Sequence, residues 1–438
     1  MSNKQRIEQH FIPESHPFYK WAMKEAGRAA RVWNDGNFVY RSVYEGKLDL
    51  IPDYADLVRS NGKILAYDLI SRMRELHVES FYDMTKKSSA GQVIILLDQA
   101  WRGFRSANAS YYEDKSRFNS RPRVPGYKKK DYNNYYCPLI YAGVDFTLKK
   151  DGKIFISRDF CLPIRTKQKK IQQVRIVPIV GGVNIEIIYK LEIPDVDSNN
   201  ERAISIDLGI NNFAAITSNI KAPAMLVNGR PLKSINQYYN KKIASIKSKL
   251  DKQGLKSSKG YRRITRKRNH KVRDFIHKTS RRIVDFMKFN NIGTCIVGHN
   301  TWWKSEVKIG KKNTQNFVFI PHTTFIEKLR YKLEDIGCQL IEIDEAYTSK
   351  CSFLDGEKIC HHEKYLGKRI KRGLFVSSKG VALNADINGS LNIARKAIGY
   401  TYIPDNSIFH PVKLDIETHL SNDFIIDSIG TELVPMIS

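Results

Sequence analysis

Three acidic residues stand at positions where an ionised carboxylate is costly unless it is paired or holds a cation. Asp207 follows the apolar run AISI and precedes a glycine, Glu345 ends the run QLIEIDE, and Asp386 opens the segment ADINGSLNIARKA. Ordinary interpretations remain open, because aspartate before glycine is common in turns and aspartate at a helix start is a common cap.

The three acids meet if their elements have one particular arrangement. If the strands that precede Asp207 and Glu345 lie parallel in one sheet, both side chains reach the same edge of that sheet. A helix that packs across this edge brings in Asp386, and its N-terminal dipole favours a carboxylate there. Three carboxylates suit two Mg²⁺ ions, with Mn²⁺ as a substitute, of which one activates a water and the other stabilises the leaving oxygen.

The overall charge indicates a polyanionic partner. Among 438 residues, 73 Lys and Arg stand against 45 Asp and Glu, which gives a net charge of +28. An excess of this size destabilises a compact chain unless a polyanion neutralises it, so nucleic acid is the expected partner. The sequence has no apolar run of membrane-spanning length and no apolar leader, so we expect a cytoplasmic protein that binds no membrane. Six scattered cysteines fit a reducing compartment better than a disulfide framework.

Much of the excess charge lies in one helical segment. Residues 233–288 hold nineteen Lys and Arg against three Asp, a net charge of +16. A solvated charged face is the ordinary interpretation, but basic residues at almost every helical angle favour phosphate contact. A second basic cluster, RPRVPGYKKK, lies upstream. The candidate nucleic-acid-binding residues are Lys241, Lys242, Arg262, Arg263, Arg266, Lys267, Arg268, Lys271, Arg273, Arg281 and Arg282, with Lys128, Lys129 and Lys130 in the upstream cluster.

Hydrophobic periodicity divides the chain into helical, β and mixed regions. Apolar residues spaced by three and four predict a helical lobe over 16–115. Two hairpins, turning at Asp151-Gly152 and Gly181-Gly182, predict a small β-barrel domain over 116–200, and we assign residues 1–15 to it as an N-terminal strand.

The remaining residues predict an α/β domain over 201–400. Three meandering strands are followed by the basic helical insert (233–290) and then by an alternation of strands and helices, which is typical of a mixed sheet. A loop-rich segment over 347–382 precedes the last helix. The tail, 401–438, is acidic and is expected to stand apart. The chain is therefore expected to be a multidomain α+β protein.

Ordered motifs in the C-terminal half resemble those of the TnpB proteins of bacterial insertion sequences. The resemblance covers about residues 203–400 and rests on SIDLGINNFAAITS, VNGRPLKSINQYYNKK, IVGHNTWWK, EAYTSKCSFLD and NADINGSLNIARKA. The upstream RPRVPGYKKK looks like the segment before the family's β-domain. These proteins are RNA-guided DNA nucleases related to the type V CRISPR effectors.

The resemblance implies a fold, partners and catalytic positions. It implies a helical recognition lobe, a wedge-like β-barrel and a RuvC-type, ribonuclease-H-like nuclease domain. It also implies a guide RNA derived from the element's end and a double-stranded DNA target next to a short adjacent motif, with the protein at the nucleoid when bound to that target. Asp207 takes the first catalytic position and Asp386 the third.

The second catalytic position departs from the family pattern. Most of the family carries a glutamate at the end of the strand that reads CIVGHN here, and His299 stands in that place. Mg²⁺ prefers oxygen ligands, so Glu345, on an adjacent strand, looks like a relocated glutamate. Asp344 is the reserve choice if the strand end slips by one residue.

The cysteine pattern departs as well. Family members often carry two Cys-x-x-Cys pairs, whereas this chain has Cys351 followed by Ser-Phe-Leu and then Cys360-His361-His362. Adjacent ligands seldom surround one tetrahedral ion, so we expect no zinc site, a degenerate zinc-finger-like loop over 347–382, and reduced thiols.

These observations predict a metal-dependent DNA endonuclease guided by RNA. The main alternative is a nuclease-dead protein that binds DNA through the same guide and represses transcription. A strand-transferring transposase, which acts on element ends without RNA, and a plain RNA-binding module are further alternatives. Cutting upon addition of Mg²⁺ separates the first two.

Overall fold

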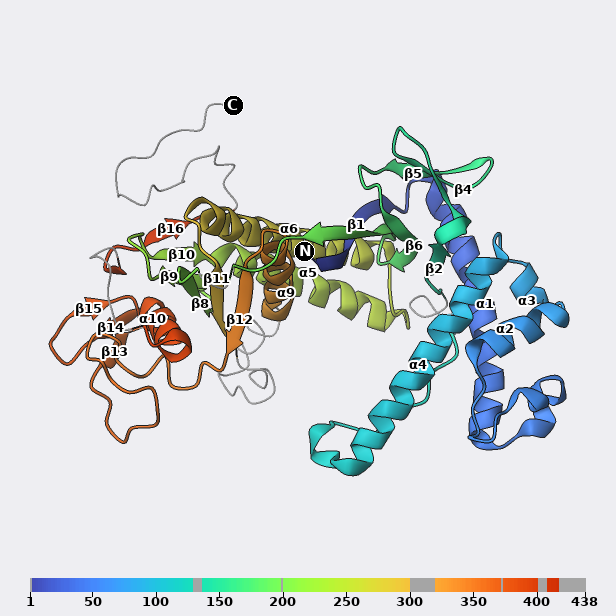
Figure 1. Cartoon of the computed structure of the whole chain (residues 1–438), viewed down its shortest axis with the longest axis horizontal. Helices are drawn as coiled ribbons and strands as arrows, with labels where there is room; N and C mark the ends of the chain where they lie inside the picture. Colours follow the sequence, from blue (N-terminus) through green and yellow to red (C-terminus); the bar gives the residue numbers. More distant parts are fainter. Residues whose placement is uncertain are drawn as a thin grey trace. The chain divides into compact units, whose positions relative to one another are not determined.

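The computed structural model describes residues 2–128, 136–197, 200–299, 320–371, 373–400 and 408–416. The chain divides into two compact units, residues 3–191 and residues 192 onward. Figure 1 shows the elements of both units along the chain. Among the described residues, no helix is long and apolar enough to cross a membrane.

The first unit combines long helices with two small sheets. Its helices are α1 (Pro17–Glu45), α2 (Ala66–Glu75), α3 (Glu79–Tyr82) and α4 (Lys87–Glu113). Its strands are β1 (Ser2–Pro13), β2 (Leu139–Ala142), β3 (Thr147–Leu148), β4 (Lys153–Ser157), β5 (Phe160–Arg165), β6 (Ile171–Ile179) and β7 (Gly182–Ile193). The sheet orders are β1-β7-β6-β2 and β3-β4-β5. Within the described residues, the predicted β-domain therefore consists of a four-stranded and a three-stranded sheet.

The helices and sheets of this unit share one core. Trp101 and Phe81 of the helices belong to the same buried cluster as Val174 and Ile185 of the sheet. The predicted boundary near residue 115 thus separates two kinds of secondary structure but not two cores. The hairpins turn where the sequence predicts, because Gly152 and Gly181 have positive φ angles of 81° and 85°.

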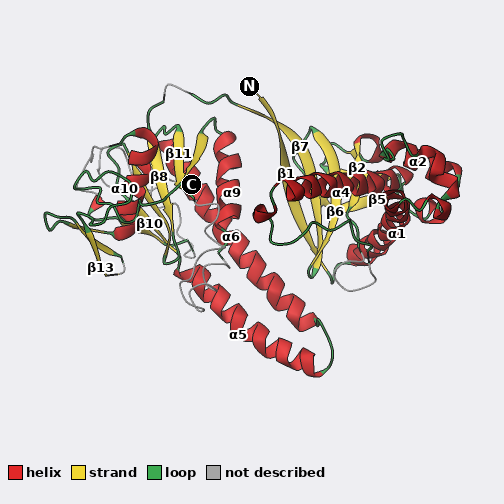
Figure 2. Ribbon diagram, turned by 90° about the horizontal axis from the view of Figure 1, so that it is seen from below, coloured by secondary structure: helices red, strands yellow, loops and turns green. Residues whose placement is uncertain are grey.

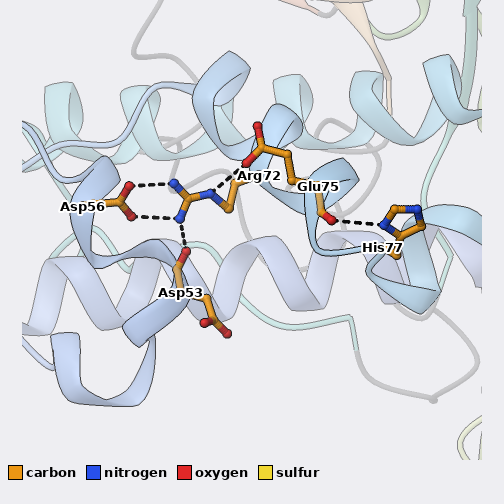
Figure 3. A network of polar contacts seen from close by, with 5 residues as sticks. All are labelled: Asp53, Asp56, Arg72, Glu75 and His77. Atoms are coloured by element: carbon orange, nitrogen blue, oxygen red, sulfur yellow. Dashed lines mark hydrogen bonds and ion pairs between the residues drawn. The ribbon is translucent and has the colours of Figure 1, made fainter.

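Ion pairs on the surface connect helical elements of the first unit. The guanidinium of Arg72 contacts both carboxylate oxygens of Asp56, the Glu75 carboxylate and the Asp53 carbonyl, as Figure 3 shows. His77 contacts the Glu75 carbonyl at 3.0 Å. This network ties α2 to the 3-10 turn over Pro52–Leu57.

The second unit is built on a six-stranded mixed sheet. Its strands are β8 (Ala203–Leu208), β9 (Asn212–Ser218), β10 (Met225–Asn228), β11 (Thr294–Gly298), β12 (Gln339–Ile343) and β16 (Val412–Leu414), in the order β12-β11-β8-β9-β10-β16. β11 pairs parallel with both β8 and β12. The parallel arrangement that the sequence analysis required is therefore present.

Helices cover the two faces of this sheet differently. α10 (Ala385–Ile398) packs on the face that bears Ala203 and Ile296, where Ile393 joins them. α6 (Lys259–Phe289) and α9 (His322–Glu334) pack on the opposite face, against Ile204, Ile206 and Val297. Strand alternation thus decides which side chains face which helix.

The predicted basic insert is a helical hairpin. α5 (Arg230–Lys252) and the first part of α6 lie side by side and extend from the sheet, as Figure 2 shows. A small sheet of β13 (Lys368–Lys371), β14 (Leu374–Val376) and β15 (Ala382–Leu383) precedes α10.

One expectation about the tail is wrong in part. β16 pairs parallel with β10, so residues 412–414 belong to the six-stranded sheet and do not stand apart from it. The rest of the acidic tail, 417–438, lies outside the described residues.

Candidate active site

Strand β8 directs Asp207 toward α10. Ser205 and Asp207 lie on the same face of β8, whereas Ile204 and Ile206 pack on the opposite side. The Ser205 hydroxyl contacts the Ser390 carbonyl of α10 at 2.8 Å. Two residues further along the strand, the Asp207 carboxylate lies so close to α10 that a Cβ on Gly389, the residue before Ser390, would stand 2.5 Å from Oδ2. Glycine at 389 is therefore what allows α10 to pack against this carboxylate.

The start of α10 places Asp386 near the same carboxylate. Asn384 caps the helix, because its side-chain oxygen accepts the backbone N–H of Asp386 at 2.9 Å. The Asp386 carboxylate then accepts from Nδ2 of Asn212 at 2.7 Å and lies 3.5 Å from the Arg369 guanidinium. Sequence reasoning had not singled out Asn212 or Arg369, although Arg369 lies in the basic loop next to the cysteines.

Glu345 reaches this region from the end of β12. The strand ends at Ile343, and the carbonyl of Glu345 accepts both the N–H and the hydroxyl of Thr348, at 3.1 and 2.8 Å, which turns the chain. Gly298, at the end of neighbouring β11, lies under Ile393 of α10: a Cβ there would clash with the Ile393 side chain and would lie 3.3 Å from Cβ of Glu345. The glycine therefore lets Ile393 pack on the end of β11, next to Glu345.

Asp207, Glu345 and Asp386 line one cavity of about 720 Å³, together with Arg230, Arg369 and Lys413. The convergence that the sequence analysis required is thus present at the level of the cavity. The three acids do not yet form a tight ligand set, because no group of three His, Cys, Asp or Glu side chains in the described ranges is close enough to hold a metal ion.

The environment disfavours the ionised forms of two of these acids. Burial, followed by the negative charges of Asp386 and Glu345, raises the pKa of Asp207 well above its usual range, and Arg369 opposes this effect. Burial and the neighbouring Asp344 raise the pKa of Glu345 to about 7. A divalent cation would relieve both effects, and carboxylate oxygens are the ligands that Mg²⁺ prefers. The donor set therefore fits Mg²⁺ or Mn²⁺.

His299 and Asp344 lie away from this cavity. Nδ1 of His299 lies 3.1 Å from Oε2 of Glu342, a carboxylate that Arg330 of α9 also contacts. His299 is therefore engaged on the α9 side of the sheet. Asp344 is exposed, and its carbonyl accepts from Nζ of Lys396 at 2.7 Å. Neither residue lines the cavity, whereas Glu345 does.

The cysteine-containing loop is organised by hydrogen bonds. The buried Glu357 carboxylate accepts the N–H groups of Ser352 and Leu366, at 2.7 and 2.9 Å. From α10, Nδ2 of Asn392 donates to the carbonyls of Thr348 and Cys351. The loop is thereby joined to the helix that carries Asp386.

The cysteines of the loop contact neighbouring carbonyls and a histidine. The thiol of Cys351 contacts the carbonyls of Lys358 and Cys360, at 3.4 and 3.6 Å, and burial raises its pKa. Cys360 contacts His362 at 3.4 Å. A structural zinc site needs four convergent donors, and the expectation that this loop binds no zinc stays a prediction.

The candidate nucleic-acid-binding residues divide by exposure. Lys241 and Lys242 on α5 are exposed, as are Arg263, Lys267, Lys271, Arg273, Arg281 and Arg282 on α6. Arg262, Arg266 and Arg268 are half-buried, and Arg268 donates to Asn236 of α5 at 2.9 Å, so it also holds the hairpin together. In the first unit, the ammonium group of Lys128 lies 4.6 Å from the centre of the Trp33 ring. Lys129 and Lys130 lie outside the described residues.

The tail contributes residues that sequence reasoning missed. Lys413 and Asp415, on and after β16, line the same cavity as the three acids. Asp415 also accepts from Nδ2 of Asn228 at 2.7 Å. The alternation in PVKLD was the available signal, but the acidic composition of the tail concealed it.

The second unit has a mixed sheet with an acid on its first strand, an acid after a parallel strand and an acid at the start of α10, which is the arrangement that the resemblance to TnpB proteins implied. Comparison with known proteins agrees. Residues 186–304 match the family OrfB_IS605, described as a probable transposase, and residues 322–393 match the Cas12f1-like TNB domain. These matches confirm the resemblance to TnpB-type proteins.

Individual proteins are similar to this chain at low sequence identity. The TnpB-like protein ORF457 of Acidianus two-tailed virus is 24% identical over 231 residues, or 48% of this chain and 47% of its own length. The match therefore spans about half of that relative. A Cas12f1 structure determined with sgRNA and target DNA aligns with a TM-score of 0.51 at 13% identity, covering 86% of this chain and 82% of its own. The mini-RNA-guided endonuclease CRISPR-Cas_phi3 aligns with a TM-score of 0.46 at 11% identity, covering 92% and 93%.

Proposed function

We propose that this protein is an RNA-guided, divalent-metal-dependent DNA endonuclease associated with a transposable element. The observation that carries the proposal is the cavity lined by Asp207, Glu345 and Asp386. Two of these acids have raised pKa values, so the cavity favours a bound cation over bare carboxylates.

The three carboxylates would hold two Mg²⁺ ions, for which Mn²⁺ can substitute. Bound there, the metal supplies an activated water and stabilisation of the leaving oxygen in phosphodiester hydrolysis. Asn212 holds Asp386 in place through its hydrogen bond. Arg369 borders the same cavity, where its positive charge can contact a phosphate oxygen once the acids are occupied by metal.

We infer the nucleic-acid partners from the charge of this chain and from the proteins that it resembles. The basic hairpin of α5 and α6 offers exposed cations to phosphates. The Cas12f1 relative was determined with sgRNA and target DNA. By analogy, we propose a guide RNA from the element's end and a double-stranded DNA target beside a short adjacent motif. Base pairing with the guide then reads most of the sequence.

The test begins with the RNA that the protein retains. The protein is expressed with its flanking DNA, the co-purifying RNA is sequenced, and a DNA duplex matched to that RNA is incubated with the complex and Mg²⁺. We expect cleavage of the matched duplex only, and none with EDTA. A complex that contains no defined RNA, or that cuts matched and unmatched duplexes alike, contradicts the proposal.

A nuclease-dead, RNA-guided DNA-binding protein is the second candidate. It is favoured by the ion pair of Asp386 with Arg369 and by the absence of a preassembled three-acid ligand set in the described ranges. In the same experiment it gives specific binding of the matched duplex without cleavage in either Mg²⁺ or Mn²⁺.

A further inference from the structure

We propose that the contact line between α6 and α9 binds the phosphate backbone of an RNA that the protein holds without cutting. We call this line the cationic seam; it comprises Arg273, His277 and Arg281 of α6 with Lys328 and Lys332 of α9. The inference rests on the proposed function, because it assigns a site to the guide RNA. It adds α9 to the candidate basic surface, which the sequence had placed on residues 233–288 and on the upstream cluster RPRVPGYKKK.

The spacing of these residues places their basic side chains in one row on α6 and in one row on α9. Arg273, His277 and Arg281 are each four residues apart on α6, as are Lys328 and Lys332 on α9. Nζ of Lys332 crosses the interface and donates to the His277 carbonyl at 2.9 Å and to the Ser280 hydroxyl at 2.7 Å. The two helices are therefore joined along this line by a lysine.

The bonding of Lys332 is unusual for a buried ammonium group. Lys332 is 8% exposed, and the two groups that accept its hydrogen bonds are neutral. A buried charge ordinarily has a counter-ion, because desolvation is otherwise uncompensated. Charge repulsion is evident as well: burial and the charges of Arg281 and Lys328 lower the pKa of Lys332 to about 8.

The positive charge of the seam comes from its lysines and arginines. Burial and the charges of Lys328, Lys332 and Arg273 lower the pKa of His277 to about 4, so this side chain is neutral near pH 7. Asp274 pairs with Lys278 at 2.7 Å, and Asp285 lies 3.7 Å from Arg281. The hydrogen bonds of Lys332 therefore go to neutral groups, and Lys328, which is only half-buried, is accessible to an incoming anion.

The position of the seam favours a retained RNA over the DNA strand that enters the cavity. α6 and α9 cover the face of the sheet opposite α10, whereas the three acids face α10. A strand that passes through the catalytic cavity thus lies on the other side of the sheet from the seam. Arg273 also continues the basic run of the hairpin along α6. A retained RNA, bound on the hairpin and continuing along the seam, fits both facts.

The experiment measures RNA affinity as a function of salt. The RNA that co-purifies with the wild-type protein is transcribed with a fluorescent label and titrated with wild type, Lys328→Gln, the double variant Lys328→Gln/Arg273→Gln, and Lys221→Gln. Lys221 is an exposed lysine between β9 and β10 and controls for the loss of one positive charge. A single-stranded DNA of the same sequence is titrated in parallel.

The expected result is a weaker and less salt-dependent complex. Lys328→Gln removes one phosphate contact. This loss should lower the affinity for RNA about fivefold near 0.15 M salt and reduce the slope of log K against log [salt] by about 1. The double variant should lose about twice that slope, Lys328→Arg should retain the wild-type slope, and Lys221→Gln should retain both affinity and slope. RNA affinity and slope unchanged in the double variant overturn the seam, as does a loss confined to DNA. If no defined RNA co-purifies, the proposed function itself fails, and this is a separate outcome.

Discussion

At the scale of single residues, the candidate site depends on which acid completes the pair of aspartates. Glu345 lines the cavity with Asp207 and Asp386, whereas His299 contacts Glu342. The geometry therefore supports the proposal that Glu345, and not His299, takes the second position.

This assignment predicts different outcomes for two substitutions. Glu345→Gln keeps the shape of the side chain but removes a carboxylate ligand, and we expect the cleavage rate of matched DNA to fall by at least about 100-fold, with guided binding retained. His299→Ala should change the rate by much less. Single-turnover cleavage and DNA binding by the purified RNA complexes measure both effects. The reverse ranking of the two variants would mean that Glu345 is not the second ligand.

Gly389 provides an independent test of the spacing between the aspartates. A Cβ at this position would stand 2.5 Å from Oδ2 of Asp207, closer than real Cβ contacts allow. Gly389→Ala should therefore displace the carboxylate and raise the Mg²⁺ concentration needed for half-maximal cleavage. The matched control is Gly103→Ala, because a Cβ on Gly103 of α4 would meet no atom within 4 Å. An unchanged Mg²⁺ requirement in Gly389→Ala would mean that α10 does not set the position of Asp207.

At the scale of elements, α10 connects the cavity lined by the three acids to the cysteine-containing loop. Its first turn carries Asp386, and nine residues later Arg395 donates to the carbonyls of Phe353 and Glu357, at 2.5 and 3.2 Å. The loop is therefore held by side chains of α10 and by the buried Glu357.

This arrangement predicts a loop that is stable without zinc. Glu357→Gln weakens two hydrogen bonds to a buried carboxylate and should lower the free energy of unfolding by about 2 kcal/mol. A zinc chelator should leave the unfolding midpoint of the wild type unchanged. Thermal unfolding with and without chelator, together with elemental analysis of the purified protein, makes the measurement. Stoichiometric zinc, or a midpoint that falls on chelation, would contradict this account.

The sequence alone predicted the elements that carry a local signal and missed those that do not. Glycine turns and apolar alternation identified the hairpins of the first unit and the strands that carry Asp207 and Glu345. The pairing of β16 with β10 was missed, since a three-residue edge strand in an acidic tail has little periodicity to detect. Arg369 and Asn212 were missed because their contacts with Asp386 join segments far apart in the sequence.

At the scale of the whole molecule, charge and fold support the same activity from different directions. A net charge of +28 favours a polyanionic partner, and the six-stranded sheet carries acids whose pKa values are raised. The account therefore predicts that a duplex matched to the co-purifying RNA, together with Mg²⁺, raises the thermal stability of the complex more than either does alone, because each neutralises a different excess of charge. A combined shift no larger than the larger of the two single shifts would contradict the account.

The most direct test of the central claim is to locate the metal. Crystals of the protein grown with Mn²⁺ would be measured at the manganese absorption edge. We predict anomalous peaks within ligand distance of the carboxylates of Asp207, Glu345 and Asp386, and their loss in Glu345→Gln. Crystals without such a peak, or with Mn²⁺ bound to Asp207 and Asp386 while the Glu345 side chain stays out of reach, would contradict the account.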